Sequence, residues 1–143
     1  MNFGDVSETT ADTLEGKVKG ETFVMIPIGL SFSDNDKLGL KIAKASIEGK
    51  IKERIFIGEY HGAAWKFIES IRLKIDDKVY TLTDNNPART VWSSTYVIER
   101  LVFPITDEMY NNIIKSKSIT AELLTRVIVV EGEQLNKIKE FLK

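Results

Sequence analysis

Alternation of apolar and polar residues at a period of two, between residues 65 and 83, is the feature that most constrains this fold. From residue 65 to residue 75, most odd positions carry a large apolar side chain, whereas the even positions from 66 are largely lysine, serine or arginine. This pattern predicts a half-buried β-strand. After an interruption at 76–77 the apolar residues resume over 78–83, which predicts a β-hairpin whose short loop pairs Leu73 with Tyr80.

Other short runs of β-branched and apolar residues extend this pattern over most of the chain. Strands are expected at 22–30, 38–51, 54–60, around 91–103 and over 119–130. Pro27 cannot donate to a strand ladder, so the first of these is expected at an edge or broken there. Residues 38–51 fit a helix in part, but Gly39 and Gly49 favour a strand.

Helical spacing appears only near the C-terminus. Thr106 resembles a helix N-cap, and acidic residues follow it in the first turn. Apolar residues then recur at helical spacing over 109–114, and again after Gly132 in a final amphipathic segment.

These elements predict a mainly β fold, an antiparallel β-sandwich or open barrel with one or two short helices in its C-terminal half. An α+β sheet with helices on one face is the alternative. Residues 5–20 hold four acidic residues, four serines or threonines and few apolar side chains. We therefore expect a flexible polar leader over residues 1–20, followed by a single globular domain over residues 21–143.

Composition excludes several classes of function. The chain has no cysteine, one histidine and a formal net charge of −1. A disulfide framework, a cysteine nucleophile and a basic nucleic-acid-binding surface are therefore not expected. No glycine-rich phosphate loop and no apolar stretch of about 18 residues is present, so neither a cofactor nor a membrane span is predicted. Residues 34–36 are interpreted as a polar turn and not as a metal site, because Ala45 stands where a calcium loop needs a carboxylate.

Two glutamates interrupt otherwise apolar faces. Glu69 has the parity of Ile71, and Glu99 has the parity of Leu101. Buried carboxylates must be paired or protonated. One reading is a catalytic carboxylate pair in a hydrolase. The favoured reading is a structural ion pair in which Arg89 neutralises Glu99 or Glu69 and fastens the loop over residues 84–90.

His61 is the only imidazole of the chain. It lies two residues after Glu59, so the two side chains share a face if the segment is a strand. His61 is then a candidate general base or binding group oriented by Glu59. The alternative is an exposed turn residue beside Gly62.

Aromatic residues at strand starts and in loops are the remaining candidates. Trp65, Trp92 and Tyr96 lie where a sandwich displays binding residues, and with His61 they form the predicted binding set. Such rings suit a sugar or a peptide, although tryptophans also fill the ends of cores.

The favoured hypothesis is a small non-enzymatic module, exported or displayed at a cell surface, that binds a protein or carbohydrate partner or serves structurally. The alternatives are a hydrolase that uses Glu69 and Glu99, or Glu59 with His61, and an intracellular domain that binds a small ligand. No residue is assigned a catalytic role with the favoured hypothesis.

Overall fold

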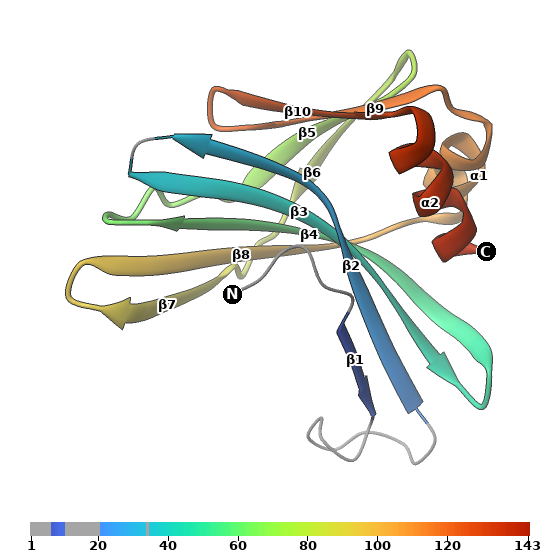
Figure 1. Ribbon diagram of the computed structural model, residues 1–143, viewed down its shortest axis with the longest axis horizontal. Helices are drawn as coiled ribbons and strands as arrows, with labels where there is room; N and C mark the ends of the chain where they lie inside the picture. The colour runs from blue at the N-terminus through green and yellow to red at the C-terminus, as the bar shows by residue number, and fades with distance from the viewer. Residues whose placement is uncertain (1–6, 11–20, 34) are drawn as a thin grey trace.

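Alternating apolar residues build the chain into two stacked antiparallel sheets (Figure 1). The computed structural model describes residues 7–10, 21–33 and 35–143. Their strands are β1 (Ser7–Thr10), β2 (Glu21–Ser33), β3 (Asp36–Ile47), β4 (Lys50–Gly62), β5 (Ser70–Ile75), β6 (Lys78–Thr83), β7 (Ala88–Ser93), β8 (Tyr96–Pro104), β9 (Ser118–Leu123) and β10 (Arg126–Glu131). Their helices are α1 (Asp107–Lys115) and α2 (Gly132–Leu142).

The two sheets differ in size. Sheet A has the strand order β1-β2-β3-β4-β8-β7, and sheet B has the order β10-β9-β5-β6. Every described pair of strands is antiparallel, and the described strands do not close into a barrel. The predicted mainly β, sandwich-like architecture with two short helices in the C-terminal half is confirmed.

The predicted hairpin is also confirmed, in register. Leu73 pairs with Tyr80 across the turn at 76–77, and Ile75 pairs with Lys78. The first strand of this hairpin was expected to start at residue 65. That start is wrong, because β5 begins at Ser70 and residues 65–69 belong to no strand. A positive φ of 54° at Phe67 breaks the extended path there, and this disrupts the alternation that residue parity suggests.

The segment of ambiguous periodicity is a strand. Residues 36–47 form β3, and a turn with positive φ at Glu48 and Gly49 leads into β4. The register of β2 against β3 shifts just after Pro27. The described part of β1 pairs only with residues 22–25 of β2, so Pro27 lies beyond that pairing. Because proline has no backbone N–H, it could not donate a hydrogen bond to a neighbouring strand there.

Both helices are fixed at one end of the two sheets (Figure 1). The predicted cap is confirmed: the Thr106 side chain accepts a hydrogen bond from the Met109 amide. At the other helix, Lys44 Nζ donates to the Phe141 carbonyl at 2.6 Å and Arg54 Nε to the Leu142 carbonyl at 2.5 Å. Cationic side chains therefore satisfy the last carbonyls of α2.

The hydrophobic core lies between the sheets and under the helices. Among its fully buried members are Leu40, Ile42, Phe56, Ile71, Leu73, Leu101, Ile113, Ala121 and Ile138. Two glycines let the sheets approach. A Cβ at Gly29 of β2 would lie 2.3 Å from Ile128 Cγ2, and one at Gly58 of β4 would lie 3.3 Å from Leu123 Cδ2. Larger residues there would separate the layers.

Four residues of the expected polar leader lie in a described strand. Ser7–Thr10 forms β1 and pairs with β2, from Ser7 opposite Met25 to Thr10 opposite Thr22. The rest of the predicted leader, residues 1–6 and 11–20, lies outside the described residues. In the described part of the chain, neither helix has the length and apolar character that crossing a membrane requires.

Candidate functional site

The candidate site is built on the β7–β8 hairpin. Val91 pairs with Val97, but the next pair joins Ser93 to Tyr96, so Trp92 is an extra residue on β7. A bulge of this kind redirects the side chain that it carries. The Trp92 side chain is left 70% exposed at the end of the sheet.

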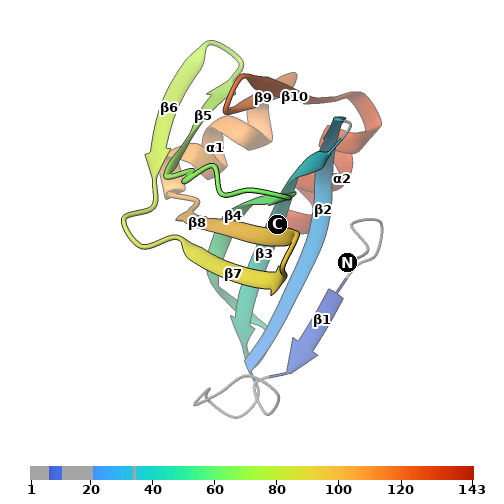
Figure 2. The ribbon, with the colours of Figure 1, turned by 90° about the vertical axis from the view of Figure 1, so that its left-hand side faces the viewer.

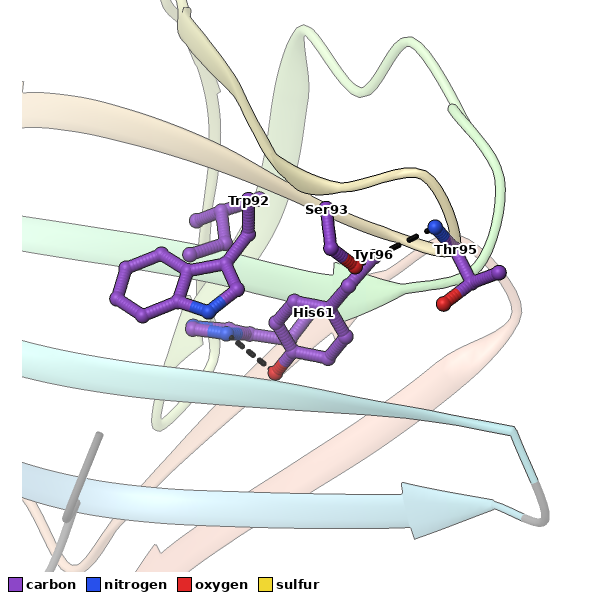
Figure 3. Close-up of a pocket in the computed structure, with 6 residues that line it drawn as sticks. His61, Trp92, Ser93, Thr95 and Tyr96 are labelled. Atoms are coloured by element: carbon purple, nitrogen blue, oxygen red, sulfur yellow. Dashed lines mark hydrogen bonds between the residues drawn. The ribbon is translucent and has the colours of Figure 1, made fainter.

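A pocket of about 440 Å³ lies beside Trp92 (Figure 3). The described residues that line it are His61, Trp92, Ser93, Thr95, Tyr96 and Ile98. The structure therefore brings together three of the four residues of the predicted binding set. Ser93, Thr95 and Ile98 were not singled out from the sequence, although their closeness to Trp92 across a two-residue turn is a usable signal. The volume suits a single sugar ring or one or two side chains.

His61 forms the floor of this pocket. Its side chain is only 2% exposed, because β4 continues to Gly62. His61 is therefore not the exposed turn residue of the alternative interpretation. The ring Nδ1 lies 2.9 Å from the Tyr96 hydroxyl, and Nε2 lies 3.1 Å from Glu59 Oε1. An ionised carboxylate only accepts, so Nε2 carries hydrogen, and in the neutral ring Nδ1 accepts from Tyr96.

Glu59 beneath the histidine is a fully buried anion. Arg100, its partner across the strands, donates from Nε at 2.7 Å, and Lys41 Nζ lies 3.4 Å away. Burial opposes ionisation of Glu59, but the hydrogen bond from His61 and the charge of Arg100 outweigh it and lower the pKa to about 2. The carboxylate therefore stays charged at any physiological pH.

Tyr96, His61 and Glu59 form a chain with the order of a nucleophile, a base and an orienting group. The nucleophile position does not fit that chemistry, however. Burial and the negative charge of Glu59 raise the pKa of Tyr96, so the phenol keeps its proton. In the described residues no buried side-chain nitrogen or oxygen lacks a hydrogen-bond partner. The network is thus suited to holding the pocket floor rigid.

Glu99 lies on the opposite, core-facing side of sheet A. It is fully buried and accepts hydrogen bonds from three consecutive backbone amides, those of Lys66, Phe67 and Ile68, at 2.7 to 3.1 Å. Arg89, its neighbour across the strands, donates from Nε at 3.2 Å. Arg89 therefore lies in β7. Its partner Glu99 holds residues 66–68 in place, whereas the loop over residues 84–90 was the segment that this ion pair was expected to fasten.

Glu69 does not face inward as its parity suggested. Its side chain is exposed, and it lines a separate polar pocket with Arg72 and Glu122. The physical reason is the turn at Phe67, which puts Ile68 inside and residues 69 and 70 outside. Glu69 and Glu99 therefore have different surroundings, one solvated and one enclosed by donors.

Trp65 is the predicted binding residue that does not line the pocket. It is half-buried and packs against the core, with its ring centroid 6.4 Å from that of Phe67. Phe67 itself is 64% exposed, and the Arg89 guanidinium lies over its ring. A positive φ at a phenylalanine cannot be predicted from the residue pattern, so the sequence does not predict this exposed ring.

The predicted polar turn before β3 is held by internal contacts. Asp36 accepts a hydrogen bond from Ser33 Oγ at 2.6 Å and pairs with Arg126; Asp34 lies outside the described residues. Burial opposes ionisation of Asp36, yet these partners lower its pKa. Among the described side chains, no three histidines, aspartates or glutamates gather as metal ligands would. Comparison with protein-family models, with curated proteins and with solved structures finds no match to this chain.

Proposed function

We propose that this chain is a non-catalytic binding module that recognises a macromolecular partner through the Trp92 pocket. The observation that carries the proposal is an exposed indole, 70% accessible, beside a pocket whose floor is fixed by the buried His61 and Glu59 and by the half-buried Tyr96. Exposed aromatic side chains on a rigid support are typical anchors of binding sites.

The fixed floor favours recognition over reaction. His61 contacts Glu59 and Tyr96, and Glu59 contacts Arg100 and Lys41, so proton transfer to a ligand would disrupt an interlocked set of bonds. The solvated Glu69 and the enclosed Glu99 do not present the facing carboxylates that a glycoside hydrolase needs. The carboxylate-pair alternative therefore has no support in the geometry.

Export or display at a cell surface is part of the proposal, with a protein or a carbohydrate as partner. The absence of cysteine is compatible with such a setting. Fractionation of cells that express the native gene tests it, with the chain expected in the extracytoplasmic or surface fraction. Recovery only with cytoplasmic markers would favour the intracellular alternative.

Binding at Trp92 can be measured by tryptophan fluorescence, because the chain has only two tryptophans. The variant Trp65→Phe leaves Trp92 as the sole emitter, and Trp92→Phe is the matched control. The probes are N-acetylated amino-acid amides and methyl glycosides. We expect at least one probe to protect Trp92 from acrylamide quenching with saturation near 1 mM, a binding free energy of about −4 kcal/mol. If no probe of either set protects Trp92, the proposal is wrong.

A further inference from the structure

Among the described strands, β7 forms one edge of sheet A. It is the last described strand of that sheet, beyond β8, and Figure 2 shows it along the outer border of the hairpin. All six of its residues are exposed. An edge strand presents unpaired backbone N–H and C=O groups along one side.

The bulge at Trp92 protects the end of this edge against pairing, but residues 88–91 keep a regular ladder with β8. The sequence of β7 holds no proline, lysine or acidic residue, and its one charged side chain, Arg89, turns inward to Glu99. The edge strand of sheet B that begins at Arg126 is different. Arg126 bonds Ser31 and Asp36, and Ile128 packs on Gly29, so β2 covers β10.

Apolar side chains flank the β7 edge on both faces of sheet A. Val91, 65% exposed, shares the face of Arg89, and the exposed Phe67 ring lies beside that guanidinium, 5.5 Å from ring centroid to Cζ. Trp92 and its pocket occupy the opposite face with His61 and Ile98. A strand added to this edge places alternate side chains against these two apolar surfaces.

Phe67 is held in position at a cost in backbone energy. Its φ of 54° is unfavourable for a phenylalanine, and the amides of residues 66–68 stabilise it by binding the Glu99 carboxylate. A ring that packed into the core would explain such strain, but this one is exposed. The arrangement displays an aromatic side chain next to the β7 edge.

We infer that β7 binds an extended segment of a partner protein as an added strand, with alternate side chains at Phe67 and Val91 and at the Trp92 pocket. The occupant is a polypeptide because only a peptide backbone repeats donors and acceptors at the spacing of a strand edge. The inference rests on the proposed function and specifies the partner class of the same site.

A defined peptide tests this inference with the full chain. The probe is a capped hexapeptide of alternating threonine and valine, titrated into ¹⁵N-labelled protein, together with six versions that each carry one N-methyl group. We expect binding to slow amide hydrogen exchange in β7. N-methylation is expected to weaken binding at least tenfold at every second position, where the amide would point at β7, and less than about twofold at the positions in between. This alternation is the signature of strand pairing.

Two lysine substitutions of exposed valines supply the matched control. Val91→Lys puts a charge on the β7 edge and should weaken peptide binding at least tenfold, whereas Val127→Lys on β10 should leave it unchanged. Equal effects of the two variants would overturn the inference, as would the absence of peptide binding.

Other outcomes separate this inference from the function on which it rests. If Trp92→Ala abolishes peptide binding while N-methylation shows no alternation, the strand addition is wrong and the pocket remains a binding site. If the protein dimerises with concentration and Val91→Lys prevents it without peptide, the occupant is a second copy and the inference fails. Protection of Trp92 by a glycoside alone would likewise overturn it.

Discussion

Individual buried charges carry much of the organisation of sheet A. Glu59 and Glu99 are both fully enclosed, yet they face opposite sides of the sheet and have different partners. Glu59 is surrounded by cationic side chains and His61, whereas Glu99 receives three backbone amides and one arginine. The first supports a pocket and the second shapes a loop.

Glu59 should make stability depend on acid. Its pKa falls from 4.5 to about 2 in the folded state, so the stabilisation it supplies is complete above pH 4.5. The free energy of unfolding should therefore decline as the pH drops from 4.5 towards 2. Urea titrations at stepped pH should show a flatter profile for Glu59→Gln in that window. The exposed Glu140→Gln is the control and should follow the wild-type slope.

Glu99 and Arg89 should not be equivalent. Arg89→Ala leaves the carboxylate with three amide donors, so we expect a loss of about 1.5–3 kcal/mol in chemical denaturation. Glu99→Ala strands those donors and should cost about 4 kcal/mol or more. A larger loss for Arg89→Ala would show that the arginine, and not the amides, holds this carboxylate.

At the scale of elements, residue parity predicted strands well and their ends poorly. The hairpin at 70–83 could be derived because period-two burial and turn length agree on one register. The loop at 65–69 could not, because its shape depends on Glu99, about thirty residues away, and on a positive φ that phenylalanine seldom adopts. The same alternation therefore predicted the burial of Leu73 correctly and the burial of Glu69 incorrectly.

The loop conformation makes a prediction about Phe67. Glycine tolerates positive φ without strain, so Phe67→Gly should keep or raise the free energy of unfolding, whereas Phe67→Val should lower it by about 1–2 kcal/mol. Differential scanning calorimetry of the two variants distinguishes them. Greater stability of the valine variant would mean that Phe67 is not strained in solution.

At the scale of the whole molecule, the pocket was foreseen only as a set of residue types. Trp92, Tyr96 and His61 were predicted to bind, but they meet because β4 and β8 are neighbours in sheet A, a long-range pairing that no local pattern encodes. Trp65 was grouped with them because it is an aromatic residue at an expected strand start. It packs against the core instead, and the strand begins only at Ser70.

Packing of the two sheets sets another testable property. Gly29→Ala places a methyl group against Ile128 and should destabilise the fold by about 1–3 kcal/mol. The double variant Gly29→Ala/Ile128→Ala removes the clash, so its cost should be less than the sum of the two single costs. Additive losses in urea denaturation would show that the sheets are not in contact at this point.

Trp92 is proposed to serve recognition and not folding. The most direct measurement is the free energy of unfolding of Trp92→Ala beside that of Trp65→Ala. Because Trp92 is 70% exposed and Trp65 packs on the core, we expect a loss within about 0.5 kcal/mol for the first and about 2 kcal/mol or more for the second. Equal losses would contradict the account, since Trp92 would then be a structural residue.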